Sequence, residues 1–284
     1  KVSAFTIPKL MVNAAAGNIS IRYGAKGNSM AVSTACASAT HAMGMAMETI
    51  RCGMADVVFT GGSEAALTPL ALAAFASMKA LSTRNDDPAG ASRPFDRDRD
   101  GFVLAEGGSA LIFEEYEHAR KRGANMLAEV AGFGFTSDSD HLTQPREDGE
   151  AAARAMQTAL QDAGIAPEDV DYINAHGTGT PLGDVAETTA IKKVFGPVAE
   201  RVIVSSTKSA VGHSLGASGG LELIACIQAM LHGVVPPTIN LEHPGDGCDL
   251  DYCPNTARDH KVRVALSNSF GFGGHNACLV VRAV

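Results

Sequence analysis

VDYINAHGTGT, residues 170–180, is an apolar run that ends in a glycine-rich turn, as a buried strand does. The next stretch, DVAETTAIKKVFG (residues 184–196), is expected to be a helix, and RVIVSSTKS (residues 201–209) a second strand. A strand, a glycine-rich turn, a helix and another strand in this order are typical of α/β proteins, whose sheets are covered mainly on both faces. These residues therefore decide the fold class.

The same alternation extends in both directions from this unit. Before it, we expect a strand at 28–35, a buried helix at 36–53, a buried strand at 55–65, a long polar loop at 82–101, a strand at 102–115, a charged helix through Arg122, a strand at 126–139 and an amphipathic helix at 149–164. After it, we expect a buried helix at 216–233 and two final strands within 261–284. Several of these helices are apolar on most faces, which places them between layers.

The overall composition indicates a globular protein with a large core. The chain has 284 residues, of which 45% are apolar and 19% charged, enough for one or two domains. Its net charge of −8 disfavours a nucleic-acid partner. The basic clusters within 93–99 and at 120–122 are interpreted as solvated surface, although either is able to meet an acidic partner.

The six cysteines point neither to a metal nor to an oxidising compartment. The sequence contains no C-x-x-C pair and no H-E-x-x-H motif, so a zinc site has little support. A secretory signal and an apolar run of membrane-spanning length are also absent from the sequence, so we expect free thiols in the cytoplasm and no membrane partner. The chain begins with Lys1, and we expect it to be a fragment of a longer protein.

Four residues carry candidate chemistry. Cys36 is expected between a strand and a buried helix, where the helix dipole and free N–H groups favour a thiolate. His176 follows one strand, and Lys208 and His213 follow another, which is where α/β proteins place site residues. The glycine-rich turn SNSFGFGGHN (residues 267–276) supplies N–H groups able to face an oxyanion. Each of these features also has a purely structural interpretation. Cys36 could be a buried core cysteine, His176 a histidine with satisfied hydrogen bonds at a turn, and residues 267–276 a tight hairpin.

An alternative interpretation makes Ser214 the nucleophile. Residues 212–216, GHSLG, fit the G-x-S-x-G elbow of serine hydrolases, and Asp249 and His260 follow in triad order. The elbow requires the serine directly at a strand end, whereas several polar residues separate it from VIVSS. That interpretation also leaves the other loops without roles. We therefore interpret the match as coincidence, and the small residues that follow as close packing of a buried helix.

Four motifs together resemble one enzyme family. They are TACAS around Cys36, NAHGTGTPLGD around His176, SSTKSAVGHSLGASGGLE around Lys208 and His213, and NSFGFGGHN near the end. With ALSTRND, SRPFDRDRDGFVL and VPPTINLEHPGDGCDLDY, they are similar to the beta-ketoacyl-ACP synthase II family, the condensing enzymes of type II fatty acid synthesis. The similarity covers essentially the whole chain.

The resemblance implies a thiolase-like α/β fold, layered αβαβα, with an incomplete N-terminal half, because Cys36 comes early in the chain. Residues 1–124 would form the C-terminal part of the half that carries the nucleophile. Residues 125–284 would form the half that carries both histidines. His275 is a departure, since many family members have threonine at this position.

The resemblance also implies a decarboxylative Claisen condensation of acyl-ACP with malonyl-ACP, which gives 3-oxoacyl-ACP and CO₂ in fatty acid elongation. Cys36 would take the acyl chain as a thioester, its helix dipole activating the thiol without a dedicated base. The N–H groups of Cys36 and Phe272 would form the oxyanion hole, with Phe272 also gating the acyl pocket. His176 and His213 would polarise the malonyl thioester, and Lys208 would position His213 and set the local charge.

Further roles also come from the resemblance alone. The expected buried polar network contains Glu222 and Asp184. The expected pantetheine contacts are Thr178, Thr180 and Thr143. A monovalent cation, Na⁺ or K⁺, is expected at Asn174, Glu222, Ser267 and Asn268. The expected contacts to an acidic carrier protein are Lys79 and Arg84.

No cofactor is required by this scheme, since 4′-phosphopantetheine arrives on the acyl carrier protein. The expected partners are that carrier protein and a second copy of the chain. Two other interpretations stay open at this point. One is a polyketide-type ketosynthase, and the other is a catalytically inactive truncated remnant or partner subunit.

Overall fold

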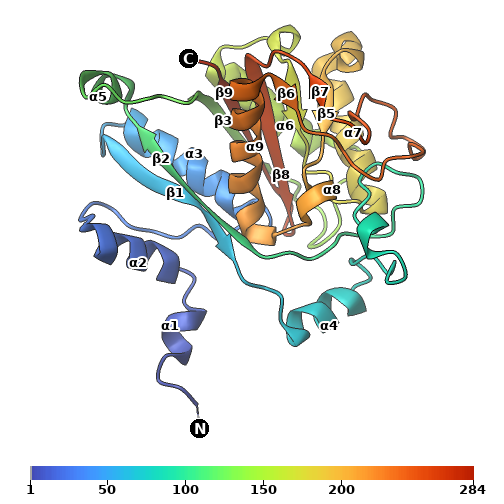
Figure 1. Ribbon diagram of the computed structural model, residues 1–284, viewed down its shortest axis with the longest axis horizontal. Coiled ribbons are helices and arrows are strands. Elements are labelled where there is room, and N and C mark those ends of the chain that lie inside the picture. The colour runs from blue at the N-terminus through green and yellow to red at the C-terminus, as the bar shows by residue number, and fades with distance from the viewer. Residues whose placement is uncertain (1) are drawn as a thin grey trace.

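The computed structural model describes residues 2–284, in which helices and strands alternate (Figure 1). The helices are α1 (Thr6–Leu10), α2 (Ala14–Tyr23), α3 (Ser38–Arg51), α4 (Pro69–Ser77), α5 (Tyr116–Lys121), α6 (Glu150–Ala163), α7 (Pro181–Phe195), α8 (Lys208–Val211) and α9 (Ser218–His232). The strands are β1 (Val57–Glu64), β2 (Gly107–Glu114), β3 (Glu129–Ser137), β4 (Tyr172–Asn174), β5 (Ile203–Ser205), β6 (Val234–Val235), β7 (Arg258–Asp259), β8 (Val264–Gly271) and β9 (His275–Arg282). The predicted α/β class is confirmed.

A five-stranded mixed sheet forms the centre of the molecule, in the order β3-β9-β8-β4-β5. Strand β4 runs parallel to both of its neighbours, and β9 pairs antiparallel with β3 and β8. The register places Asn174, at the end of β4, beside Ser205 of β5 and Ser267 of β8. The loops that follow β4 and β5 therefore leave the sheet at the same edge, which is where α/β sheets build their sites.

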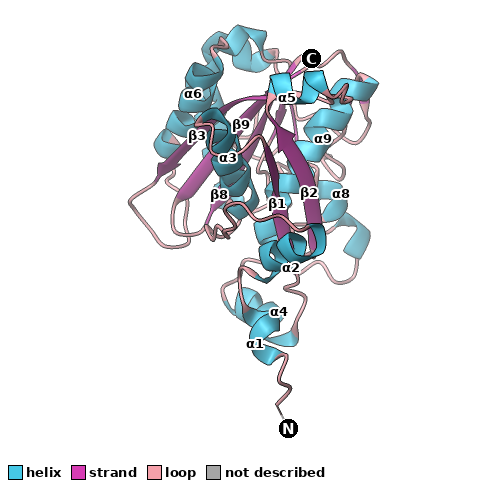
Figure 2. Ribbon diagram, turned by 90° about the vertical axis from the view of Figure 1, so that its left-hand side faces the viewer, coloured by secondary structure: helices cyan, strands magenta, loops and turns pink. Residues whose placement is uncertain are grey.

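Alternate residues of the central strands face two separate cores. In β9, Cys278 and Val280 belong to a core with α6 and α7, whereas Leu279 and Val281 belong to a core with α3 and α9. Phe113 of β2 joins the second core from the other side, so α3 and α9 lie between the central sheet and the two-stranded β1–β2 sheet. The turned view shows β1 and β2 beside α3 and α9, with α6 beyond β3 (Figure 2).

The layers thus follow one another as helix, sheet, helix and sheet, in agreement with the expected thiolase-like order. Helix α2 supplies part of a further layer, because Tyr23 at its end stacks on Phe59 of β1 with ring centroids 5.4 Å apart. Both figures show α1 reaching away from the layered body toward the N-terminus.

Helix α9 is packed closely on both sides, as its small residues predict. A Cβ atom at Gly219 would overlap Oγ1 of Thr40 in α3, and one at Gly220 would overlap Oγ of Ser109 in β2. The stretch Leu215–His232, which includes α9, has the length and hydropathy of a membrane-spanning helix, contrary to the expectation that no stretch does. Its buried residues face the two sheets, which identifies it as a core helix.

Two sequence predictions of strands need correction. Residues 28–35 form no strand in the part of the chain that the structure describes, and only an isolated bridge joins Thr34 to Cys36. The segment is largely exposed and lacks a neighbouring strand to pair with among residues 2–284. The strand predicted as buried at 55–65 is β1, but Val57 and Phe59 are 39% and 40% exposed because α2 covers little of its outer face.

Candidate active site

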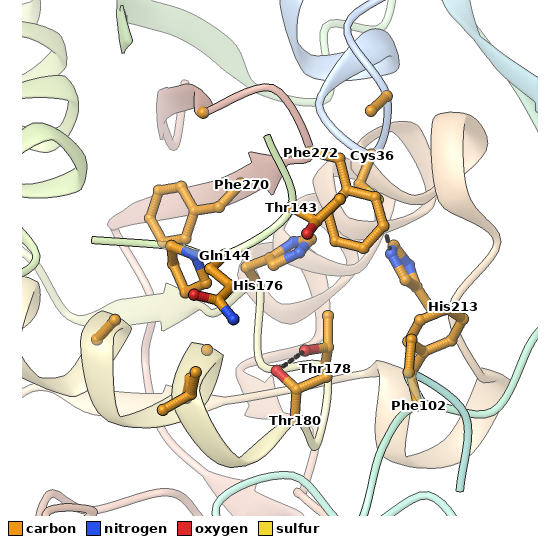
Figure 3. A pocket seen from close by; sticks show the side chains of 18 of the residues that line it. Cys36, Phe102, Thr143, Gln144, His176, Thr178, Thr180, His213, Phe270 and Phe272 are labelled. Atoms are coloured by element: carbon orange, nitrogen blue, oxygen red, sulfur yellow. Dashed lines mark hydrogen bonds between the residues drawn. The ribbon is translucent and has the colours of Figure 1, made fainter. Parts of the chain in front are cut away.

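A cavity of about 590 Å³ opens where the loops after β4 and β5 meet the start of α3 (Figure 3). Cys36, His176 and His213 all line this cavity, although they come from three distant parts of the sequence. Phe270, near the end of β8, lies beside His176 with ring centroids 5.7 Å apart, and Phe272, in the turn that follows β8, lies near Cys36 (Figure 3). The structure therefore brings together the four loops that the sequence singled out.

Cys36 occupies a short turn just before α3. The preceding Ala35 has a φ of +50°, and the N–H of Ala37 donates to the carbonyl of Thr34, which turns the chain into the helix. The sulfur points into the cavity, yet the residue is buried. The main-chain N–H groups of Phe272 and of Cys36 itself lie near enough to the sulfur to lower the pKa of the thiol, and these are the two groups expected to form the oxyanion hole.

His213 is held against Cys36 by its own main chain. Its N–H donates to the carbonyl of Val103 at 2.8 Å, and its carbonyl accepts from Ala105, so the loop is fixed to the segment ahead of β2. This places Nε2 at 3.0 Å from the Cys36 sulfur, and the Phe102 ring packs against the imidazole at a centroid distance of 5.2 Å. The imidazole is fully buried, so its position is fixed from several sides.

His176 follows β4 and is held by a glutamate that the sequence analysis missed. Both carboxylate oxygens of Glu187 accept main-chain protons, from His176 at 2.8 Å and from Gly177 at 2.7 Å. The rings of His176 and His213 are nearly perpendicular, with centroids 5.4 Å apart. Glu187 lies three residues after Asp184 on α7, a spacing that places both carboxylates on one helix face and was the available signal for its role.

Asp184 fixes the rest of the same loop. Its carboxylate accepts from the N–H groups of Phe95 at 2.7 Å and Gly179 at 3.1 Å, and it lies 3.5 Å from the Arg99 guanidinium. It therefore joins the loop after β4 to the polar loop that precedes β2. Burial raises the pKa of Asp184 to about 6 and that of Glu187 to about 7, while their N–H donors oppose the shift.

Lys208 forms a buried ion pair with Glu222 of α9. Its ammonium is also 3.4 Å from Nδ1 of His176, so its contact in the described residues is with His176 and not with His213, while its charge lowers the pKa of both rings. The geometry follows from α8, which begins at Lys208 and directs its side chain under the loop of β4. The Ser269 hydroxyl donates to the Glu222 carboxylate at 3.5 Å and also contacts the hydroxyl of Thr40 in α3. These hydrogen bonds connect the ion pair to α3.

The two imidazoles are neutral in this site. Burial holds the pKa of both His176 and His213 well below 6.5, and the nearby Lys208 ammonium lowers both further. Burial also raises the pKa of Cys36 to about 11, although the Lys208 charge and the N–H donors oppose it. Burial therefore opposes the thiolate that the helix dipole is expected to favour, and α3 begins two residues after the sulfur-bearing residue.

The expected pantetheine contacts line the same cavity. Thr178 and Thr180 lie side by side with their hydroxyls 3.0 Å apart, and Thr143 faces them from the loop between β3 and α6 (Figure 3). Lys79 is also a lining residue. Arg84, in contrast, donates to the carbonyl of Asp98 and does not line the cavity in the described part of the chain.

The expected cation site coincides with unsatisfied buried oxygens. Within residues 2–284, Oδ1 of Asn174, Oγ of Ser267 and Oδ1 of Asn268 are buried without a hydrogen-bond partner. Buried oxygens without a hydrogen-bond partner are rare in folded proteins. Oxygen atoms are also the ligands that hard cations prefer. The Glu222 carboxylate is buried as well, and it contacts Lys208 and Ser269. No cluster of three histidine, cysteine or acidic side chains suited to a transition metal occurs in the described residues.

The serine hydrolase alternative fails on geometry. Ser214 is buried and its hydroxyl lies 3.2 Å from that of Ser218, outside the residues that line the cavity. Asp249 is engaged with Lys192 at the surface. His275, the departure from the family pattern, packs near His41 with ring centroids 6.2 Å apart and is likewise outside the lining.

Comparison with known families identifies two matching domains. Residues 1–119 match the family described as "Beta-ketoacyl synthase, N-terminal domain". Residues 127–242 match the one described as "Beta-ketoacyl synthase, C-terminal domain".

Curated relatives are similar over the full chain. A 3-oxoacyl-[acyl-carrier-protein] synthase 2 of Coxiella burnetii is 51% identical over 284 residues, covering 100% of this chain and 69% of its own length. The protein of the same name from Synechocystis is 52% identical over 282 residues, covering 99% of this chain and 68% of its own.

Solved structures show the same similarity. One is the complex of a type II PKS acyl-carrier protein with its ketosynthase bound to the hexaketide, with a TM-score of 0.97, 41% identity and coverage of 100% of this chain and 70% of the other. Another is a beta-ketoacyl synthase from Burkholderia phymatum, with a TM-score of 0.95, 44% identity and coverage of 100% and 68%.

Proposed function

Because the chain belongs to the beta-ketoacyl synthase family, we propose that it condenses an acyl group held on Cys36 with malonyl-ACP, giving 3-oxoacyl-ACP and CO₂. It is a condensing acyltransferase of the 3-oxoacyl-ACP synthase 2 type. The observation that carries the assignment of roles is the contact of Cys36 with His213, beside His176, in one cavity.

In the first half-reaction, the Cys36 sulfur attacks the thioester carbonyl carbon of acyl-ACP. The bond from that carbon to the pantetheine sulfur breaks, and the thiol proton of Cys36 ends on the leaving pantetheine thiol. The N–H groups of Cys36 and Phe272 stabilise the oxyanion, and Nε2–H of His213 donates to the sulfur as negative charge develops there.

In the second half-reaction, the two imidazoles act as hydrogen-bond donors. Nε2–H of His176 and of His213 donate to the malonyl thioester oxygen while the bond to the carboxylate breaks and CO₂ leaves with the enolate formed. The enolate carbon attacks the acyl carbonyl, and the bond to the Cys36 sulfur breaks. The sulfur leaves as a thiolate, and one proton taken up from water restores the Cys36 thiol. The Lys208 ammonium behind Nδ1 of His176 favours the proton on Nε2 of that ring.

The pantetheine arm of the acyl carrier protein is the ligand that fits the entrance. Thr178, Thr180 and Thr143 offer hydroxyls along the cavity, which suits the amides of that arm. Lys79 at the cavity supports an acidic carrier protein as the partner. The prosthetic group comes with the carrier protein, and the chemistry of the site calls for no other cofactor.

A monovalent cation, Na⁺ or K⁺, would be held by Asn174, Ser267, Asn268 and Glu222. It would supply positive charge to a buried polar region, and it takes no part in bond making. Its support is the set of buried oxygens without partners.

A homodimer in the cytoplasm completes the proposal. The extended, largely exposed residues 28–35 support strand pairing between two copies. All six cysteines are free thiols, which suits a reducing compartment. A polyketide-type ketosynthase is the second candidate, favoured by the similarity to the PKS complex, but the relatives of higher identity are named 3-oxoacyl-[acyl-carrier-protein] synthase 2.

Acyl-enzyme formation tests the central claim. The full chain is incubated with acyl-ACP, and its mass is measured before and after. We expect one acyl adduct in the wild-type chain and its loss in Cys36→Ala, whereas Cys52→Ala, at an exposed cysteine on the surface, keeps it. An adduct that survives in Cys36→Ala would refute the nucleophile assignment.

A further inference from the structure

The Ser218 hydroxyl has no role in the scheme so far, yet it touches the catalytic imidazole. Its Oγ lies 2.9 Å from Nδ1 of His213, on the opposite side of the ring from Cys36. Among the described residues it is the one hydrogen-bond partner that Nδ1 has. Ser218 is the first residue of α9 and is buried, so the hydroxyl is fixed by the helix and shielded from water.

A buried neutral imidazole carries one proton, on either Nδ1 or Nε2. The proposed function requires that proton on Nε2, because Nε2 faces the Cys36 sulfur and the substrate oxygen. With the proton on Nδ1, Nε2 would present a lone pair to the enolate oxygen and repel it. Whatever favours one tautomer at Nδ1 therefore decides whether His213 can act as a donor.

We propose that Ser218 is a positioning residue that donates its hydroxyl proton to Nδ1 of His213 and so holds the proton of the imidazole on Nε2. The inference rests on the proposed function, since it explains how His213 becomes the donor which that function needs. The second imidazole has an arrangement of the same kind, with the Lys208 ammonium behind Nδ1 of His176. Each ring thus has a donor behind it and Nε2 toward the cavity.

The neighbouring Ser214 is compatible with this direction of donation, although the donation does not depend on it. Its hydroxyl is 3.2 Å from Oγ of Ser218, so Ser218 is able to accept a proton from Ser214 and still donate its own to Nδ1. Ser214 itself makes no hydrogen bond to the imidazole in the described part of the chain. It therefore offers a matched control, a buried serine of the same loop that lacks the contact.

The tautomer is measured directly by ¹⁵N NMR of the full chain labelled in histidine, with the His213 signals assigned from a His213→Gln variant. We expect a protonated Nε2 and an unprotonated Nδ1 in the wild-type chain. Ser218→Ala should shift the population toward the Nδ1-protonated form, and Ser214→Ala should leave it unchanged. A wild-type chain with the proton on Nδ1, or a Ser218→Ala spectrum like that of the wild type, would overturn the inference.

Malonyl-ACP decarboxylation gives a kinetic measurement that is independent of the spectra. Loss of one hydrogen bond to the catalytic ring predicts a decrease of about three- to tenfold in kcat for Ser218→Ala, with KM nearly constant. Ser214→Ala should stay within about twofold of the wild type. If the wild-type chain forms no acyl-enzyme and releases no CO₂, the proposed function fails. If the wild-type chain is active and Ser218→Ala matches it, only the role of Ser218 fails.

Discussion

Replacing Lys208 by methionine tests the buried ion pair beneath the site. Lys208 and Glu222 are each only 2% exposed, and their charged groups pair with each other. Methionine fills a similar volume but leaves the Glu222 carboxylate without its partner in a site that excludes water. We expect the free energy of unfolding at pH 8 to fall by about 3–5 kcal/mol, as measured by urea denaturation followed by circular dichroism.

The double variant Lys208→Met/Glu222→Gln separates loss of the pair from loss of volume. It removes both charges, and replacement of a whole buried pair by neutral groups is often close to neutral in stability. We therefore expect it to recover most of what Lys208→Met loses. Glu222→Gln alone leaves the ammonium buried and should be destabilised as well, which completes a thermodynamic cycle.

The pH dependence of the single variant follows from the Glu222 carboxyl. Burial raises the pKa of Glu222 above its ordinary 4.5, while the Lys208 charge opposes this shift, so removing Lys208 raises the pKa further. A pKa that is higher in the folded state gives stability that is present at low pH and is lost as pH rises through the folded value. Lys208→Met should therefore approach the wild type as pH is lowered from 8 to 5. A loss below about 1 kcal/mol that does not change with pH, with no recovery in the double variant, would refute this reasoning.

Three further predictions concern the thiol, the helix packing and the cation. Since burial raises the pKa of Cys36 to about 11, its alkylation by iodoacetamide should accelerate about tenfold per pH unit from pH 7 to 9 by mass spectrometry, and a plateau near pH 7 would contradict this pKa. Gly219→Ala should lower the free energy of unfolding by about 1–3 kcal/mol because a Cβ would overlap Thr40, whereas Gly17→Ala, which meets open space on α2, should not destabilise the chain. Potassium chloride should raise Tm above choline chloride at equal ionic strength, and Asn268→Ala should abolish the difference; an equal Tm in both salts for the wild type counts against the cation site.

The sequence was sufficient for the α/β class because its signals are local. Apolar runs that end in glycine-rich turns identify β4 and β5, and the amphipathic pattern at 149–164 identifies α6, which ends at Gly164 in the left-handed conformation. The motifs around Cys36, His176 and His213 could be recognised for the same reason. Their convergence on one cavity depends on the strand order of the central sheet, which no local pattern contains.

The features of the site that could not be predicted from the sequence depend on contacts made in the tertiary structure. The dipole argument for Cys36 weighed a local effect but not desolvation, which raises the pKa of the thiol and can be judged only from the fold. The partner of Lys208 at Nδ1 of His176, and that of Ser218 at Nδ1 of His213, are contacts between loops that meet only in the fold. The exposure of β1 likewise depends on which elements cover the sheet. Its apolar run would look the same in the sequence whether the strand is covered or exposed.

The two-stranded β1–β2 layer has a consequence for the order in which the protein opens. Two strands alone are marginal in water, and this pair is supported mainly by α3 and α9 beneath it. Its amides should therefore exchange with deuterium earlier than those of the central sheet. Because α3 packs on β1 and begins just after Cys36, each such opening would also loosen the nucleophile while both histidines stay in place. The alignment of the catalytic residues would thus depend on the β1–β2 layer staying closed over α3.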